Sequence, residues 1–342
     1  MSITNIIAAM LVFGGLVFFH ELGHFIVAKK NKVRVYEFAV GMGPSLYKKM
    51  YHDTKYSLNL IPMGGYVRMS PLEDEEETCP EEDFLNKKPL QKIAVALAGP
   101  AMNILLALLL FILWAGILGT PVNRINEVID GYPAQAAGLK SGDTIVEVNS
   151  VEVGSWQEVI TQISKSETGT PIEFKVISKG EEQEKILLIE PIEKDGRVLI
   201  GITPAVTRNF SKAVSNGFEL TWRVSGEMLL FVKKLFSGRA GTQELSGPIG
   251  IVRIVSDSAK EGAAELLFVA GVISLNLAII NLLPIPALDG SRIIFSLVEL
   301  LRRGKRIPVE WENRINMAGF VFLMGLMIFL TYKDAMRLMI RS

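Results

Sequence analysis

The chain has 342 residues, a length typical of about two compact domains. Its 36 Lys and Arg balance its 36 Asp and Glu, and this zero net charge argues against nucleic-acid binding, which normally shows a basic excess. Hydrophobic residues make up 49% of the chain, a content that excludes global disorder. The single cysteine, Cys79, excludes an internal disulfide framework and a cysteine-based metal site.

Four stretches carry almost no charged side chains, and each is near or above the roughly 18–20 residues that cross a membrane as a helix. The sequence therefore predicts a polytopic α-helical membrane protein with four transmembrane helices. The first stretch lacks the basic start and the small-residue cleavage site of a secretory signal, so we expect it to be retained. The expected spans cover about 3–28, 93–119, 264–283 and 315–333.

Lys and Arg residues gather between the first and second spans and again between the third and fourth. Basic loops stay in the cytoplasm, so we expect both of these loops inside and the long segment between spans two and three outside. The basic C-terminal residues Lys333, Arg337 and Arg341 argue mildly the other way. The basic residues of the two loops are Lys29, Lys30, Lys32, Arg34, Lys87, Lys88, Lys92, Arg292, Arg302, Arg303, Lys305, Arg306 and Arg314.

The first cytoplasmic loop contains strand patterns over residues 33–70, with turns expected at Gly41–Pro44 and Pro62–Gly65. Apolar strands beside two spans predict a membrane-associated β-sheet, whose backbone must be paired or line a cavity. An acidic segment follows, with eight carboxylates in residues 73–83, and its ordinary interpretation is a solvated loop.

The segment between spans two and three has an ordinary soluble composition and predicts an inserted extracytoplasmic α+β domain over residues 122–206. Strands are expected at 126–129, 144–149, 172–178, 185–190 and 199–203, with an amphipathic helix at 155–165. Apolar residues at helical spacing over 211–236 predict an amphipathic helix within a connector of residues 207–262. The membrane domain then comprises residues 1–121 and 263–342.

The pentapeptide His20-Glu21-Leu22-Gly23-His24 lies inside the first apolar span. On a helix, two histidines four residues apart share one face and can bind one Zn²⁺, while Glu21 can reach a water at the metal as a general base. The plainer alternative is a pair of core histidines beside a buried glutamate. Three ionisable groups inside a membrane helix are costly, so a shared divalent cation is the better explanation.

A catalytic zinc site needs a third protein ligand. His52 lies in a polar turn and is a poor candidate, whereas Asp289 follows Pro284 and Pro286 at the end of the third span. The two prolines break the helix there, and the expected topology brings Asp289 to the same membrane face as His20 and His24. The plainer alternative for Asp289 is a helix cap or a loop carboxylate.

Several motifs in chain order resemble the site-2 protease family of intramembrane zinc metalloproteases, in its bacterial RseP and RasP branch. They are the His20–His24 pentapeptide, Gly41–Pro44, Ile61–Met69, Leu97–Asn103, Ser246–Gly250 and Asn281–Gly290. The resemblance implies that His20, His24 and Asp289 bind zinc, that Glu21 activates water, and that Asn281 steadies the substrate or the developing oxyanion. A buried asparagine that hydrogen-bonds within a helix bundle is the alternative for Asn281.

Residues 131–149 resemble the start of a PDZ domain, with Ser150 in place of a glycine common in that turn. PDZ domains bind extended peptides or C-termini at a sheet edge. The segment has room for one such domain, where RseP-type proteins carry two. The resemblance also implies location in the bacterial cytoplasmic membrane and single-span membrane substrates already trimmed outside, such as anti-sigma factors or remnant signal peptides.

These observations predict an intramembrane zinc endopeptidase whose active site lies near the cytoplasmic side of the lipid bilayer. A strand edge near residues 56–69 offers main-chain hydrogen bonds to an unwound substrate segment. Two other classes remain open at this point. A non-catalytic scaffold would rely on PDZ binding alone, and a metal transporter would use the same ligands without needing Glu21.

Overall fold

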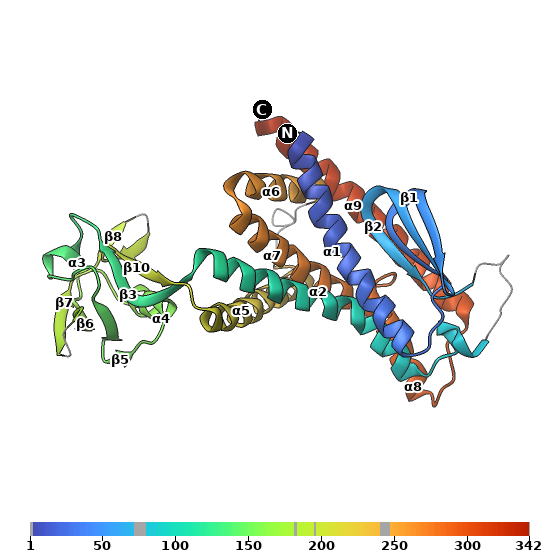
Figure 1. The fold of residues 1–342 in the computed structure, drawn as a ribbon, viewed down its shortest axis with the longest axis horizontal. Helices are drawn as coiled ribbons and strands as arrows, with labels where there is room; N and C mark the ends of the chain where they lie inside the picture. The colour runs from blue at the N-terminus through green and yellow to red at the C-terminus, as the bar shows by residue number, and fades with distance from the viewer. Residues whose placement is uncertain (1–2, 72–79, 181–182, 195, 240–246, 342) are drawn as a thin grey trace. The chain divides into compact units, whose positions relative to one another are not determined.

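The computed structural model describes residues 3–71, 80–180, 183–194, 196–239 and 247–341. The chain forms two compact units, one comprising Met1–Trp114 with Gly217–Ser342 and the other Ala115–Asn216 (Figure 1). Most of the acidic segment at 73–83 lies outside the described residues, as does Ser246 of the Gly-Pro motif. Each unit is described separately below.

Four helices of the first unit are long and apolar enough to cross a membrane, at the four places predicted from sequence. The fourth begins six residues before its expected start, and the second continues through Pro100. The four are α1 (Ile3–Lys30), α2 (Pro89–Leu118), α7 (Ala263–Leu282) and α9 (Val309–Arg341).

Helices α1 and α2 approach each other closely at Gly23. A Cβ atom on Gly23 would clash with the backbone carbonyl of Ala98, so only glycine permits this contact. Near the basic end of α1, Ala28 and Val33 pack with Val95 of α2 and with Met69 in a small apolar core. This packing fixes the first turns of α2 against the last turns of α1.

A sheet built from β1 (Glu37–Tyr51) and β2 (Thr54–Arg68) contacts α1 (Figure 1). Residues 37–40 lie between two stretches of β2 and pair with 55–58 along one edge and with 65–68 along the other. Residues 47–51 pair with 54–58 in the opposite direction to 37–40, so each long strand turns back on itself, and the expected turns at 41–44 and 62–65 lie in these bends. The chain also reverses between the paired residues Tyr51 and Thr54, in the polar turn expected at His52, which has a positive φ of 48°.

Three further helices complete the described part of this unit. The amphipathic helix predicted at 211–236 is confirmed as α5 (Phe210–Phe236), which packs Leu220 and Val224 against Phe111 and Leu275. Helices α6 (Pro248–Glu261) and α8 (Asp289–Leu301) were not predicted. Helix α6 contacts α1, α7 and α9, and two short 3₁₀ turns, η1 (Pro80–Glu82) and η2 (Phe84–Asn86), precede α2.

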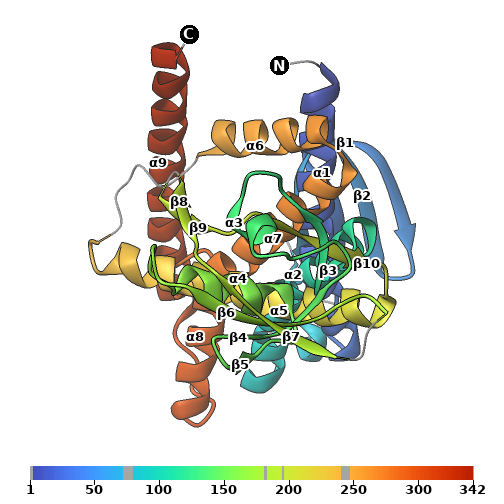
Figure 2. The same cartoon turned by 90° about the vertical axis from the view of Figure 1, so that its left-hand side faces the viewer.

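The second unit is a strand-rich α+β fold whose strands and α4 face the viewer in Figure 2. Its main sheet has the order β10-β3-β4-β6-β7, with β5 on β4, and β8 pairs with β9. Ser155 and Glu158 form a capping box at the start of α4, and Val159 of this helix is buried in the core with Ile145 and Phe174. The elements are β3 (Thr120–Val128), α3 (Pro133–Ala136), β4 (Thr144–Val148), β5 (Val151–Glu152), α4 (Trp156–Ser164), β6 (Ile172–Ile177), β7 (Glu184–Ile189), β8 (Ile192–Lys194), β9 (Arg197–Leu199) and β10 (Ile202–Thr207).

Candidate metal centre and active site

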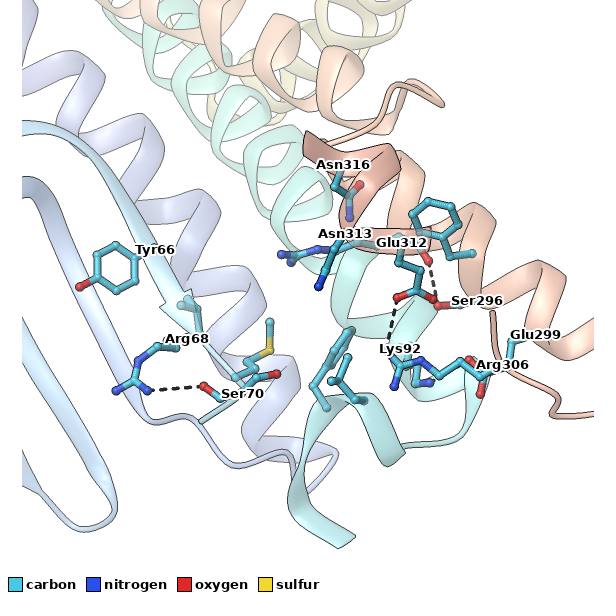
Figure 3. A pocket seen from close by; sticks show the side chains of 16 residues that line it. Tyr66, Arg68, Ser70, Lys92, Ser296, Glu299, Arg306, Glu312, Asn313 and Asn316 are labelled. Carbon is cyan, nitrogen blue, oxygen red and sulfur yellow. Dashed lines mark hydrogen bonds and ion pairs between the residues drawn. The ribbon is translucent and has the colours of Figure 1, made fainter. Parts of the chain in front are cut away.

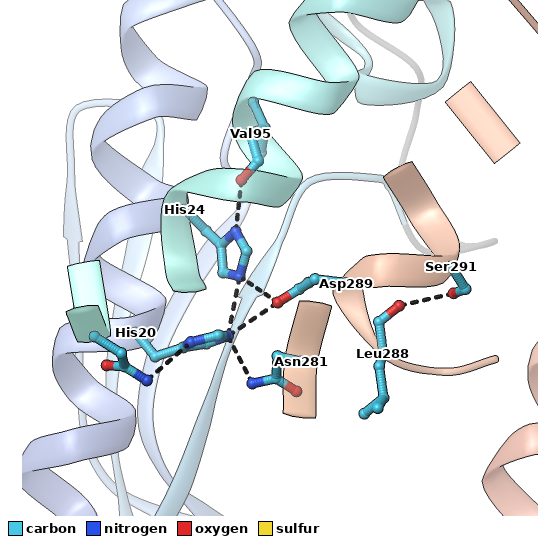
Figure 4. A network of polar contacts seen from close by, with 8 residues as sticks. His20, His24, Val95, Asn281, Leu288, Asp289 and Ser291 are labelled. Atoms are coloured by element: carbon cyan, nitrogen blue, oxygen red, sulfur yellow. Dashed lines mark hydrogen bonds and ion pairs between the residues drawn. The ribbon is translucent and has the colours of Figure 1, made fainter. Parts of the chain in front are cut away.

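Three predicted site residues meet in the first unit (Figure 4). The Nε2 atoms of His20 and His24 lie 3.2 Å apart, and each lies close to Oδ2 of Asp289, at 3.1 Å and 3.2 Å respectively. The three side chains are buried, although Asp289 lies 265 or more residues after the two histidines in the sequence. The structure therefore brings two imidazoles and one carboxylate to a single point.

Helical spacing places the two histidines on one face of α1, as expected from their separation of four residues. Nδ1 of His24 lies 2.7 Å from the backbone carbonyl oxygen of Val95 in α2. A carbonyl oxygen can only accept, so this contact places the His24 proton on Nδ1. The lone pair of Nε2 is then directed at the cluster, which is the state that a metal ligand requires.

Helix α2 leaves space for both imidazoles because residue 99 is glycine. A Cβ atom at Gly99 would overlap Nε2 of His24 and would lie 2.8 Å from Cε1 of His20. The side chains of both histidines therefore lie against bare backbone of α2. The Gly99-Pro100 pair was part of the family resemblance, and the structure gives the glycine a physical reason.

Asp289 reaches the cluster because the chain stops being helical after α7. Helix α7 ends at Leu282, and a short segment containing Pro284 and Pro286 leads to Asp289, the first residue of α8. The prediction of a helix break at the two prolines is confirmed. Helix α8 then begins at Asp289 itself, which sequence periodicity did not indicate.

Glu21 and Asn281 line a cavity of about 280 Å³ together with His20, His24 and Asp289. The amide nitrogen of Asn281 lies 3.4 Å from Nε2 of His20. Glu21 follows His20 directly on α1 and lies beside β2, since a Cβ atom on Gly65 would be 3.3 Å from its Cγ. All five predicted site residues thus border one cavity, whereas His52 lies in the β1–β2 turn and contacts Tyr51.

Two polar residues at the site carried no role in the sequence prediction. Asn103 of α2 places its amide nitrogen 3.3 Å from Nδ1 of His20. Asn316 of α9 accepts a hydrogen bond from the backbone N–H of Ala287, two residues before Asp289. Asn103 stood within a recognised motif, but Asn316 had no local signal, because its contact depends on how α9 packs against the loop after α7.

A second cavity of about 400 Å³ borders the first and shares Tyr66, Met69 and Arg292 with it (Figure 3). Its lining combines polar and apolar side chains. Lys92 of α2 forms a buried ion pair of 2.8 Å with Glu299 of α8, and Arg306 pairs with Glu312 at 3.3 Å. The Lys92–Glu299 pair links the helix behind the histidines to the helix that begins with Asp289.

The donor set fits Zn²⁺. A catalytic zinc takes three protein ligands at about 2.0–2.2 Å, so atoms around a tetrahedral ion lie about 3.3–3.6 Å from one another. The three donor atoms here are 3.1–3.2 Å apart, slightly closer than an ion would hold them. Two imidazole nitrogens with one carboxylate oxygen are also a ligand combination found in catalytic zinc sites.

Comparison with known proteins agrees with this geometry. Residues 8–326 match the family model described as peptidase family M50. A candidate zinc metalloprotease of Clostridium acetobutylicum is 34% identical over 336 residues, covering 98% of each chain. The zinc metalloprotease RasP of Geobacillus kaustophilus is 29% identical over 414 residues, covering 97% of this chain and 98% of its own. A solved PDZ domain of an SdrC-like protein from Listeria monocytogenes is 29% identical, with a TM-score of 0.22, and covers 25% of this chain and 88% of that domain.

The chain belongs to peptidase family M50, the site-2 protease family, as its sequence motifs predicted. It is therefore a metalloprotease by family. The matched range includes α2, α7, the sheet beside α1, most of α1, the first half of α9 and all five predicted site residues.

Proposed function

We propose that the protein is a zinc endopeptidase that hydrolyses peptide bonds within the membrane-spanning segments of single-span proteins. The observation that carries this proposal is the buried triangle of His20, His24 and Asp289 on and beside helices apolar enough to cross a membrane. Ionisable groups are expensive in such helices, and a bound cation offsets that cost. A peptidase that keeps its site there is equipped for substrates that lie in the bilayer.

In this proposal His20, His24 and Asp289 would hold Zn²⁺ beside the cavity that they line with Glu21. When bound, the ion supplies Lewis acidity, which polarises a carbonyl oxygen and makes water more acidic. The protein residues then have to supply a base, a proton path and a means of holding the peptide.

Glu21 is the general base. It borders the same cavity as the three ligands, and its carboxylate takes a proton from the water that attacks the scissile carbonyl carbon. As the carbon–nitrogen bond breaks, Glu21 returns this proton to the leaving amide nitrogen, which departs as an amine. Among the described residues, no hydrogen bond holds the side chain of Glu21 away from this position.

Asn281 is a donor for the substrate. Its amide nitrogen lies 3.4 Å from Nε2 of His20, so it can donate to an oxygen at the centre of the site once that imidazole nitrogen binds a metal. Donors aimed at the position where negative charge develops are worth about 3–4 kcal/mol in comparable hydrolases. We therefore assign Asn281 to the scissile carbonyl oxygen.

The last part of β2 offers a place for the unwound substrate. Residues 65–68 pair with residues 37–40 on one edge, and Tyr66 and Val67 also line the site cavity. Within the described residues the other edge has no strand partner. A helical substrate hides its carbonyls in its own hydrogen bonds, so pairing with this edge would present an extended segment to Glu21.

The location of the protein follows from its charge pattern. His24 lies six residues before Lys30, about 9 Å along α1, so the site is near the basic end of the first span. We infer that the protein is embedded in the bacterial cytoplasmic membrane with this end toward the cytoplasm. Residues 1–121 and 263–342 then form the membrane domain, with the segment 207–262 as an amphipathic connector lying on the lipid bilayer.

Residues 122–206 are proposed to be a single extracytoplasmic PDZ domain that binds peptides or protein C-termini. Substrates trimmed outside the membrane, such as anti-sigma factors or remnant signal peptides, would present a C-terminus to this domain or pass beside the domain. Cleavage by this protein would then be the second cut in regulated intramembrane proteolysis. The sequence motif at 131–149 supports this assignment.

The proposal is tested with purified full-length protein and a model single-span substrate in liposomes. Glu21→Gln should retain bound zinc and lose at least about a thousandfold in cleavage rate, because the base is lost while the ligands remain. A metal transporter would show zinc flux that survives this substitution. A scaffold would bind the substrate and leave it intact in the wild type as well. Either result contradicts the protease assignment.

The strand edge has its own test. Tyr66→Pro and Val67→Pro each remove one backbone N–H, and residues that alternate along a strand present their N–H groups to opposite edges. One of the two variants should lower cleavage sharply while zinc content stays the same. Unchanged cleavage in both variants would contradict substrate pairing at this edge.

A further inference from the structure

Asn103 lies behind His20, on the side away from the proposed metal. It is completely buried in α2, and its amide nitrogen is 3.3 Å from Nδ1 of His20. Its amide oxygen Oδ1 is also buried and has no hydrogen-bond partner among the described residues. A buried carbonyl oxygen without a donor costs about 1–3 kcal/mol, so the orphaned atom needs an explanation.

The chemistry of His20 supplies one. Its Nε2 lies 3.1 Å from Asp289 and 3.2 Å from Nε2 of His24, so Nε2 is the atom directed at the cluster (Figure 4). A nitrogen that gives its lone pair to a metal carries no proton, so a neutral His20 must carry its proton on Nδ1. That N–H then requires an acceptor, and the amide group of Asn103 is the polar group beside it.

The two ends of an asparagine amide are nearly identical in shape, and rotation by about 180° exchanges them. This rotation brings Oδ1 of Asn103 to Nδ1 of His20. The amide oxygen that lacked a donor can then accept a hydrogen bond from the Nδ1–H group of His20. His24 shows the same arrangement with a backbone acceptor, since its Nδ1 donates to the carbonyl of Val95 at 2.7 Å. Val95 and Asn103 lie eight residues apart on α2, so one helix contacts the outer nitrogen of both histidines.

We propose that Asn103 is a positioning residue whose amide oxygen accepts the Nδ1 proton of His20 and thereby holds His20 in the tautomer that binds zinc. The proposal rests on the proposed function, because it presumes the zinc site. It assigns Asn103 no contact with the substrate. Acceptors of this kind orient ligating imidazoles and make them more basic.

The test separates an acceptor role from simple packing. Asn103→Leu keeps nearly the same volume and removes the acceptor, whereas Asn103→Asp keeps an oxygen at the same place. Zinc dissociation constants are measured on purified full-length protein by competition with a chromophoric chelator. We expect zinc affinity 10–100-fold weaker for N103L and within about threefold of wild type for N103D.

Ser274 provides a matched control. Its hydroxyl donates to the backbone carbonyl of Asn103 at 2.8 Å and is completely buried, so Ser274→Ala disturbs the same point of α2 without touching the amide oxygen. S274A should lower the melting temperature of the metal-free protein and leave zinc affinity unchanged. If N103D does not fold, Asn103→Gln serves as the second variant that keeps an acceptor.

Equal zinc affinity in N103L and wild type would overturn the proposal. So would equal weakening of N103L and of a folded acceptor-keeping variant, because packing alone would then explain Asn103. A wild-type protein that binds no zinc would instead contradict the zinc site, and this inference with it. The two failures are therefore distinguishable in one set of titrations.

Discussion

The side-chain oxygen of Asn316 in α9 accepts a hydrogen bond from the backbone N–H of Ala287, at 3.1 Å. Ala287 has a positive φ of 74° and lies two residues before Asp289. A non-glycine residue in this conformation is strained and must be held by its surroundings. The fourth apolar helix thus fixes the loop that delivers the carboxylate, although it contributes no ligand.

This relationship predicts that Asn316→Leu weakens zinc binding about tenfold and lowers cleavage at least as much, because the loop is no longer held. Zinc affinity and cleavage rate measured on the same preparations check this expectation. Asn313→Leu is the matched control, since Asn313 lies one turn earlier on α9 and is exposed. If both variants bind zinc like the wild type, Asn316 does not hold the loop.

Gly99 predicts a steric effect on the metal centre. Gly99→Ala places a methyl group against Nε2 of His24 and Cε1 of His20, so the imidazoles must move and zinc should be largely lost. Gly116→Ala is the control in the same helix, because a Cβ atom there meets no neighbour within 4 Å. Metal analysis of the two purified variants should show zinc in G116A and little in G99A. Full occupancy in G99A would contradict the close approach of α2.

The buried Lys92–Glu299 ion pair predicts a non-additive effect on stability. Removing one partner leaves an unpaired buried charge, which costs about 3–5 kcal/mol, whereas an apolar pair of similar volume is often nearly neutral. Lys92→Met should therefore lower the melting temperature strongly, and K92M combined with Glu299→Leu should recover much of the loss. A double variant as unstable as the sum of the single variants would argue against the ion pair.

Glu37 predicts a pH dependence of the sheet beside α1. Burial raises the pKa of this carboxyl, but the hydrogen bond from Ser57 and the charge of Lys55 outweigh it and hold the pKa below its usual range. A carboxyl with a lowered folded pKa stabilises the fold above its unfolded pKa, and this contribution is lost as the pH falls through the folded value.

We therefore expect Glu37→Gln to be less stable than wild type at pH 7, on the order of 1.5–3 kcal/mol for hydrogen bonds to a charged group. The difference should begin to shrink below about pH 4, where the carboxyl of the unfolded chain becomes protonated, and should be lost once the pH falls through the lower pKa of the folded protein. Melting temperatures of both proteins across this range provide the measurement. A difference that is absent at pH 7, or that grows in acid, would show that Glu37 does not act through its charge.

Local patterns were sufficient to predict the parts of the site that depend on one segment. Helical periodicity places His20 and His24 on one face of the first apolar helix. Pro284 and Pro286 indicate where the third apolar helix must end. The four apolar helices follow from composition and length. Each of these predictions requires only the residues within a few turns of the feature.

The contacts that hold the site could not be predicted in this way, because they join residues far apart in the chain. Val95 and Asn103 contact the histidines from α2, and Asn316 contacts the Asp289 loop from α9. The positive φ of Ala287 is likewise set by tertiary packing rather than by a glycine signal. The sequence therefore indicated the candidate ligands, and the structure was needed for the residues that hold them in place.

The central claim is tested most directly by measuring zinc stoichiometry and substrate cleavage on the same full-length preparations of wild type, Glu21→Gln and Asp289→Ala. We predict about one zinc per chain with cleavage in the wild type, about one zinc without cleavage in E21Q, and neither in D289A. Cleavage that persists in E21Q, or full zinc occupancy in D289A, would contradict the account.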